Sequence, residues 1–426
     1  MGKLNFQGFL NIFTYAVVVI CASGSVKAMN LEEMIREALK ANPELQAYYQ
    51  QFKANQKQMI QVRALPEPRL TYTRFLSEVQ TRTGPQERII QLNQPFPWPG
   101  KLALRGGIAN REAEVAFHQY ESLQRTIIAR LADSYFDYVF LGESIAINRQ
   151  TVAYYSQLIP SVEEKVRGGG RLADSLLLEI EKEKSADVVA GLVERRPILS
   201  SKLEADMGRK PDLSKQLPFP ELSKNSIPLP PVSHLEKRLE NHPRVSAATS
   251  KVLSLTLKQE LAQKASLPEM SLGASMIDIG TGGDTAFGVM LGFNVPIRRN
   301  KYQAEFEQAS LEKCASENLK NHILNNLRAQ LHSEYQLLKD ARRRTVLFRD
   351  NLIPRAEQTL VQLEEGYRGN KAGIDEIVDA EKTLLQLRLE CLKASAEAHK
   401  RAVYLRVLTE PVTKKGIQAM PVASDP

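Results

Sequence analysis

The sequence predicts a mainly helical protein that carries a few paired β-strands and is built from two copies of one structural repeat. Three observations predict this class: two long stretches contain almost no proline, two pairs of short segments alternate apolar with small or polar residues, and the same punctuation recurs about 200 residues later. With 43% hydrophobic and 25% charged residues among 426, the chain has the composition of an ordered protein. Its net charge of +8 forms no basic block with interleaved aromatics, which excludes a nucleic-acid footprint.

Residues 1–28 are predicted to be a secretory signal peptide. Lys3 precedes an apolar run over residues 9–22, and a small-residue cleavage pattern ends at Ala28. An alternative is a lipoprotein cut before Cys21, although Ile20 is a poor fit to the small residue expected there. Either reading predicts export from the cytoplasm.

The repeat is visible as short motifs that recur in the same order about 200 residues later. The matched pairs are NPEL at 42–45 with HPRV at 242–245, LPE at 65–67 with LPE at 267–269, NQPF at 93–96 with NVPI at 294–297, and the glycine turns at 167–174 and 368–375. This register predicts a first structural repeat over 29–209 (helix, strand hairpin, long helix, helix) and a second over 233–410. A proline-rich connector over 210–232 separates them, and a C-terminal tail over 411–426 follows.

Strands are expected over residues 69–76 and 88–94 in the first repeat, and over 270–279 and 287–295 in the second. The last segment has one apolar face and one small or polar face, and its length suits a tilted membrane strand. A soluble sheet packed on helices would explain each hairpin taken singly. Since no apolar run of about 18 residues follows the signal, a membrane crossing would have to use strands.

A proline-rich elbow joins the first hairpin to a long helix. It consists of Pro95, Pro97, Trp98, Pro99 and Gly100. The prolines remove ladder donors and fix φ, so the strand is expected to stop at Gln94 and the helix to begin after Gly100. Trp98 would suit a membrane interface or, equally, fill a packing gap. Lys101 stands at the positive end of the helix dipole and calls for an external partner.

Two helices of about 100 Å are predicted, over residues 101–166 and 301–367, with Pro160 and Pro354 as their only internal prolines. Rods this long must bury an apolar stripe against other rods. One stripe is Ile377, Ala380, Leu384, Leu387, Cys391, Ala394 and Ala398; the other is Leu123, Ile127, Leu131, Tyr135 and Tyr138. Their spacing of three and four predicts a coiled-coil assembly.

The sequence predicts no enzyme, no cofactor and no metal site. The six histidines lack paired metal-ligand spacing, and neither a nucleophile elbow nor a phosphate-binding loop occurs. The glycines at 168–170 form a turn without the Lys and Ser or Thr of a phosphate loop. Cys314 and Cys391 would lie about 50 Å apart in height, too far for a disulfide.

The order of these features resembles the TolC-type outer-membrane efflux proteins, over about residues 30–410. The elbow followed by Lys101 is most similar to the outer-membrane channels of heavy-metal cation efflux systems driven by RND pumps. The resemblance implies a homotrimer in which four strands per chain close one twelve-stranded β-barrel in the outer membrane of a Gram-negative bacterium, with the helices continuing as a periplasmic α-barrel. It implies an exit duct for heavy-metal cations that works with a periplasmic adaptor and an inner-membrane pump.

The resemblance also implies roles for the two glycine turns at the periplasmic tip. The residues that would contact the adaptor or guard the closed pore are Arg167, Gly168, Gly169, Asp174, Arg368, Gly369 and Asp375. Asp375 and Asp379, one helical turn apart, would place a ring of carboxylates in a three-fold aperture, and such rings select cations. The alternative is that Asp174 and Asp375 simply cap helix starts.

Other functions remain open at this point. A channel for drug efflux or type I secretion would carry the same elements. A periplasmic coiled-coil adaptor or structural protein would share the long helices, but would need neither the two matched hairpins nor the duplication.

Overall fold

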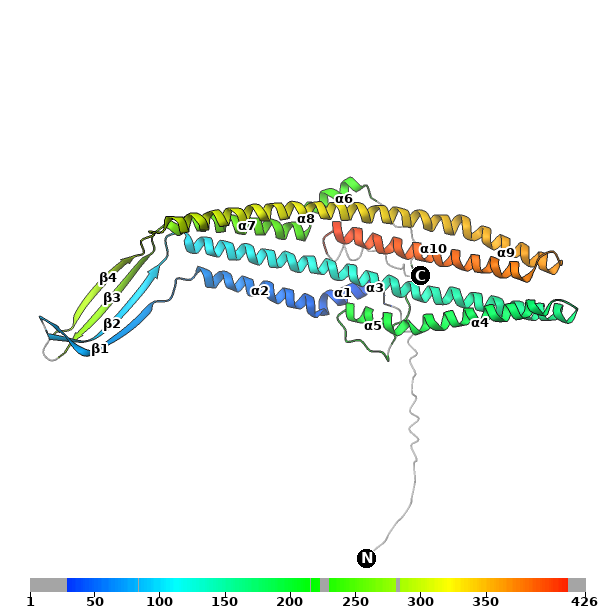
Figure 1. The fold of residues 1–426 in the computed structure, drawn as a ribbon, viewed down its shortest axis with the longest axis horizontal. Coiled ribbons are helices and arrows are strands. Elements are labelled where there is room, and N and C mark those ends of the chain that lie inside the picture. The colour runs from blue at the N-terminus through cyan, green and yellow to red at the C-terminus, as the bar shows by residue number, and fades with distance from the viewer. Residues whose placement is uncertain (1–28, 83, 215, 223–229, 281–283, 413–426) are drawn as a thin grey trace, which may run out of the picture.

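The computed structural model describes residues 29–82, 84–214, 216–222, 230–280 and 284–412. The predicted signal peptide, Cys21 and most of the predicted tail lie outside these residues. The described chain is mainly helical with four strands, which confirms the expected fold class. It is elongated, with the sheet at one end and two helix turns at the other (Figure 1). In the described residues, no helix has a stretch that is both long and apolar enough to cross a bilayer.

The same order of elements occurs twice along the chain. The first set is α1 Leu31–Ala41, α2 Pro43–Arg63, β1 Arg69–Thr81, β2 Gly84–Phe96, α3 Lys101–Arg167, α4 Leu172–Glu194 and α5 Arg196–Asp206. The second is α6 Val232–Arg238, α7 Pro243–Gln263, β3 Met270–Ile279, β4 Ala286–Phe293, α8 Arg299–Leu347, α9 Ile353–Arg368 and α10 Ile374–Thr409. Short 3-10 turns, Leu239–Asn241 and Lys264–Ser266, flank α7.

The four strands form one antiparallel sheet in the order β1-β2-β3-β4. The pairing of β2 with β3 joins the two halves of the chain, with Leu92 opposite Ala274. Strands β1 and β2 are longer than predicted, and β2 does not stop at Gln94: Pro95 pairs with Ser271 and Phe96 with Met270. A proline removes one donor but keeps its carbonyl and its extended φ, so the ladder survives until the next proline.

The two faces of the sheet differ. Cross-strand partners lie on the same face, and one face gathers exposed apolar side chains: Leu70, Tyr72, Leu92, Leu272, Phe287, Val289, Leu291 and Phe293. The opposite face carries small and polar residues: Thr71, Gln91, Asn93, Ser271, Gly273, Ser275, Gly288 and Gly292.

The two long rods are not equivalent. Helix α3 runs for 67 residues and includes Pro160, close to the prediction. The predicted helix over 301–367 is interrupted: α8 ends at Leu347, and a π-helical turn, Phe348–Leu352, precedes α9. Pro354 lacks an N–H and its ring crowds the preceding turn, and a widened turn accommodates both.

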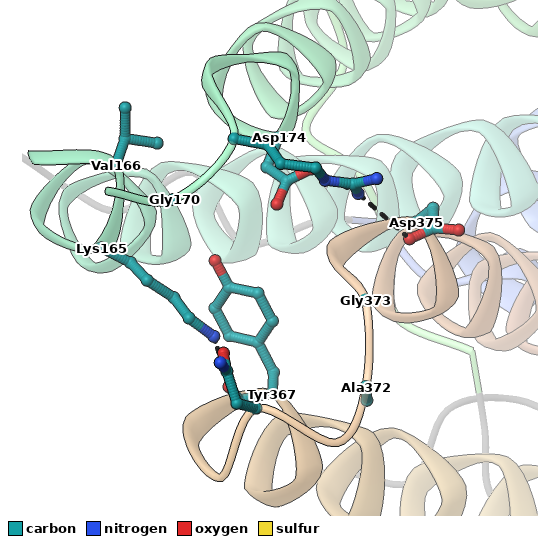
Figure 2. Close-up of a pocket in the computed structure, with 10 residues that line it drawn as sticks. Lys165, Val166, Gly170, Asp174, Tyr367, Ala372, Gly373 and Asp375 are labelled. Carbon is teal, nitrogen blue, oxygen red and sulfur yellow. Dashed lines mark hydrogen bonds and ion pairs between the residues drawn. The ribbon is translucent and has the colours of Figure 1, made fainter. Parts of the chain in front are cut away.

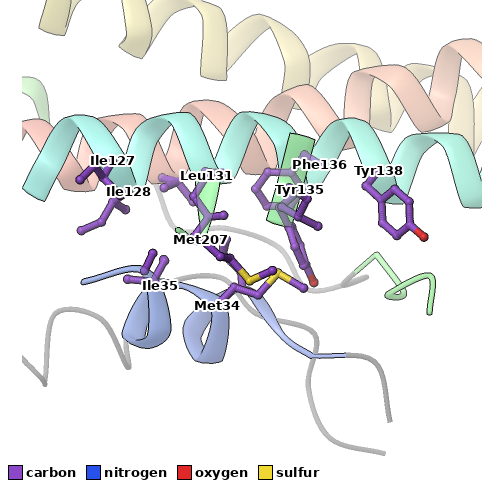
Figure 3. Packing of buried hydrophobic residues seen from close by; sticks show 14 of the residues in the cluster. Met34, Ile35, Ile127, Ile128, Leu131, Tyr135, Phe136, Tyr138 and Met207 are labelled. Atoms are coloured by element: carbon purple, nitrogen blue, oxygen red, sulfur yellow. The ribbon is translucent and has the colours of Figure 1, made fainter. Parts of the chain in front are cut away.

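The largest core lies where α1 crosses α3 (Figure 3). Met34 and Ile35 of α1 and Met207 pack against α3 side chains that include Leu131 and Tyr135. Full burial of each such side chain contributes about 1.5–3 kcal/mol. The predicted α3 stripe supplies this core, and Ile377 and Leu384 of the other stripe pack in a second cluster with α3 and α4.

Candidate functional site

At the end of the molecule far from the sheet, the turn between α3 and α4 lies beside the turn between α9 and α10 (Figures 1 and 2). A polar pocket between them is lined by Lys165, Val166, Gly170, Arg171, Asp174, Tyr367, Asn370, Ala372, Gly373 and Asp375. Two predicted tip residues, Asp174 and Asp375, are thus brought together from opposite halves of the chain. The Arg171 guanidinium lies 2.7 Å from Asp174 Oδ1 and 4.0 Å from Asp375 Oδ1.

The two turns end their helices in the same way but use different residues in the left-handed conformation. In the first, Gly169 adopts φ +103°, and the amide of Gly170 donates to the Lys165 carbonyl at 3.0 Å. In the second, Asn370 adopts φ +63°, and the Lys371 amide donates to the Gly366 carbonyl at 2.7 Å. Both arrangements use a left-handed residue to satisfy the last carbonyls of a helix.

A contact that sequence reasoning missed ties the two turns together. Lys165 Nζ donates to the Tyr367 carbonyl at 2.7 Å and lies 3.8 Å from the centre of the Tyr367 ring. Burial raises the pKa of the Tyr367 phenol, nearby Asp174 raises it further, and Arg171 opposes both. The sequence hints at this contact only through position, because Lys165 and Tyr367 each lie just before a predicted glycine turn.

Other predicted tip residues lie outside the pocket. Arg167 is exposed and has only a 3.8 Å contact with Glu163, and Arg368 is the exposed last residue of α9. Gly168 and Gly369 are the C-caps of α3 and α9. Asp379 is exposed one turn beyond Asp375 on α10 and does not line the pocket.

The helix-capping interpretation is wrong in its strict form. The N-caps are Arg171 for α4 and Gly373 for α10, and neither helix has a side-chain cap hydrogen bond. Asp174 and Asp375 instead lie inside the first turn of these helices. There a carboxylate still interacts favourably with the helix dipole, but its oxygens stay available to Arg171.

The elbow lies at the other end of α3. Gly100 is the N-cap with φ +90°, a left-handed conformation that favours glycine, and α3 begins at Lys101 as predicted. Trp98 is half-buried, and its carbonyl accepts from the Lys101 amide at 3.1 Å. Lys101 is only 5% exposed, and its Nζ lies 3.2 Å from Glu269 Oε1 and 3.4 Å from the Leu267 carbonyl. The expected partner is therefore the carboxylate of Glu269, just before β3.

A buried carboxylate and a half-buried one lie in the seam between the two helical hairpins, near the tip. Glu381 on α10 is 3% exposed and accepts from the Thr151 hydroxyl at 2.8 Å, and Tyr154 donates to Glu364 at 2.6 Å. Burial raises the pKa of Glu381, while the hydrogen bond from Thr151 lowers it. No group of three or more metal-capable side chains occurs within the described ranges.

The comparisons with known proteins agree with this architecture. Residues 34–172 match the family of outer membrane efflux proteins. The cobalt-zinc-cadmium resistance protein CzcC of Cupriavidus metallidurans is 23% identical over 380 residues, which is 88% of each chain. The solved structure of CusC has a TM-score of 0.76 at 15% identity and covers 89% of this chain and 91% of that one. The solved structure of the outer membrane protein VceC of Vibrio cholerae has a TM-score of 0.74 at 16% identity. The match covers 93% of this chain and 97% of VceC. The outer membrane efflux family is thus matched over residues 34–172, and the fold of this chain is the one seen in CusC and VceC.

Proposed function

We propose that this protein is the outer-membrane exit duct of a tripartite efflux system and that it passively conducts heavy-metal cations delivered by an inner-membrane pump. One observation carries the proposal: a four-stranded sheet with an exposed apolar face sits at one end of rods that end in a cross-linked polar tip. The apolar face suits lipid, and the small, polar face suits a water-filled lumen.

The sheet argues for an oligomer, and the likeness to the outer membrane efflux family makes a homotrimer the proposed form. Strands β1 and β4 each pair on one side only in the described sheet, and an unpaired edge cannot be left in hydrocarbon. Four strands are too few to close on themselves, because the smallest membrane barrels have eight. Three copies joined edge to edge give twelve strands, with β4 of one chain beside β1 of the next.

Metal cations are proposed as cargo because CzcC is a cobalt-zinc-cadmium resistance protein. The duct itself needs no metal-ligand cluster, since a passive channel must bind its cargo weakly. Asp375 and Asp379, repeated by three-fold symmetry, would form carboxylate rings that attract cations at the tip. In the single chain the Asp375 carboxylate is 67% exposed, and Arg171 approaches it only to 4.0 Å.

The adaptor is proposed to dock on the outward side of the tip. Arg167 and Arg368 project from corresponding ends of α3 and α9, and the caps Gly168 and Gly369 leave the backbone of both turns accessible. Matched basic side chains on the two turns give the trimer six similar contact points around its rim.

Two experiments test the proposal. The oligomeric state in mild detergent, measured by native mass spectrometry, is expected to be a trimer; a monomer, or a protein released without detergent by osmotic shock, would contradict the duct and favour a periplasmic adaptor. A deletion strain is expected to lose tolerance to cobalt, zinc or cadmium and to regain it with the wild-type gene. Loss of tolerance to dyes and antibiotics alone would instead assign a drug-efflux channel.

A further inference from the structure

A second cleft lies far from the tip, near the middle of α3. Its volume is about 330 Å³, and its walls come from α3, the start of α7, α8 and the end of α10. Ser122, Thr126 and Ala129 of α3 form one side, and Leu327, Val407 and Leu408 form an apolar side. The charged and titratable residues of its lining are Arg125, Arg130, Asp133, His242, Arg244 and Tyr404.

Arg125 is the unusual member of this lining. Arg125 is only 8% exposed, and its buried Nη1 has no hydrogen-bond partner. Burial lowers the pKa of its guanidinium and the Glu121 carboxylate raises it, but Glu121 contacts His118 at 2.8 Å, and no carboxylate within the described ranges lies within ion-pair distance of Arg125. Arginine nevertheless stays charged in proteins. A buried charge without a partner is strongly destabilising, so this position selects for a bound counter-charge.

The remaining charges leave the cleft positive. The Arg130 guanidinium forms ion pairs with Glu44 at 3.2 Å and with Asp206 at 3.1 Å. Asp133, the only acidic residue of the lining, is held by Lys400 at 3.3 Å and by the Tyr404 hydroxyl. Neither arrangement neutralises Arg125.

The start of α7 adds to the positive potential. His242 is buried and accepts the Arg244 amide on Nδ1 at 3.2 Å, so the ring is neutral and its Nε2 carries the proton. Arg244 itself is exposed, and no carboxylate in the described chain pairs with its side chain. The cleft thus combines two uncommitted guanidinium groups, a neutral ring N–H and a helix N-terminus, which are the groups that proteins use for oxyanions.

We propose that this cleft binds a small oxyanion, either a phosphate or a carboxylate group, with Arg125 and Arg244 as its cationic ligands. Planar guanidinium groups match the oxygen pairs of both anions, and the apolar side of the cleft strengthens the attraction by lowering the local dielectric constant. The cleft volume leaves room for the anion and several waters of about 30 Å³ each. This site belongs to one chain and requires neither metal cargo nor the tip.

The test is calorimetric titration of the purified full-length protein in detergent with inorganic phosphate, acetate and chloride. Saturable binding of phosphate or acetate at one site per chain is expected. Arg244→Gln, at an exposed position, is expected to weaken that binding at least tenfold without unfolding the protein, and Arg125→Met is expected to abolish it. Because Arg125→Met could fail to fold, the Arg244 variant alone decides the question.

Two matched controls sharpen the result. Arg406 also has a buried Nη1 without a partner but does not line the cleft, and Arg328 is an exposed arginine of α8 outside the lining. Arg406→Met and Arg328→Gln are expected to bind phosphate or acetate like the wild type. Absence of saturable oxyanion binding, binding of chloride only, or equal affinity in wild type and Arg244→Gln would overturn the proposal.

Discussion

Lys101 at the start of α3 and Glu269 just before β3 form an ion pair at 3.2 Å that joins the two halves of the chain beside the sheet. The ammonium group is buried, whereas the carboxylate is 42% exposed. The two partners therefore have unequal consequences when they are removed.

Glu269→Gln should destabilise the protein by about 1–3 kcal/mol, because it leaves a buried ammonium group with only the Leu267 carbonyl as a partner. Lys101→Met should cost less, since Glu269 can return to water. Thermal unfolding in detergent measures both, and the double variant should resemble Lys101→Met alone. As a control, Glu312→Gln breaks the surface pair with Lys258 and should leave stability almost unchanged. Equal losses for the two single variants would contradict this account.

At the tip, Lys165→Met should increase the mean current of the reconstituted protein in a planar bilayer. The substitution removes both the hydrogen bond to the Tyr367 carbonyl and the contact with its ring, which together link the two turns of the tip. Tyr367→Leu keeps the carbonyl and should therefore open the pore less. The control is Lys371→Met, an exposed lysine of the same tip, which should leave the current unchanged. A current in Lys165→Met that equals the wild type would show that this tie does not close the pore.

His242 should make the protein sensitive to acid. Burial, together with the charges of Arg125 and Arg244, lowers its pKa to about 3. Below about pH 6.5 the imidazole of the unfolded chain is protonated, whereas that of the folded chain stays neutral until about pH 3. The free energy of unfolding therefore falls as the pH drops from about 6.5 towards 3, by about 2 kcal/mol at pH 5. His242→Asn keeps an acceptor for the start of α7 but cannot titrate, and the difference between its denaturant unfolding curves at pH 7.5 and pH 5 should be smaller than in the wild type. Parallel pH dependence in the two proteins would rule out this role.

Glu381 should act in the opposite direction. Its pKa is raised by burial, so between its unfolded and folded pKa values the folded chain holds a proton that the unfolded chain has lost, and stability falls as the pH rises through this window. Glu381→Gln should be more stable than the wild type at pH 7.5, and the gain should vanish in acid. Thr151→Val removes the hydroxyl that donates to the carboxylate and should destabilise the protein at pH 7.5. A Gln variant that is less stable at pH 7.5 would mean that the ionised carboxylate is held by stronger contacts than the Thr151 hydrogen bond.

Local chemistry in the sequence determined the rods, the hairpins and the joints between them. The spacing of Ile127, Leu131 and Tyr135 predicted a buried stripe because a helix brings every third and fourth residue to one face. Gly100 predicted the start of α3 because its neighbours exclude any earlier helix. These features depend on residues a few positions apart, so they can be read without knowing the fold.

Tertiary structure alone decided the pairing of β2 with β3, the partner of Lys101, and the meeting of Arg171 with Asp375 across the tip. Each joins residues more than 150 positions apart in the sequence, and no local pattern specifies which distant carboxylate a cation will reach. The same holds for Arg125, which no sequence motif singles out. Only the packing of α7, α8 and α10 around it buries the charge and leaves it without a partner.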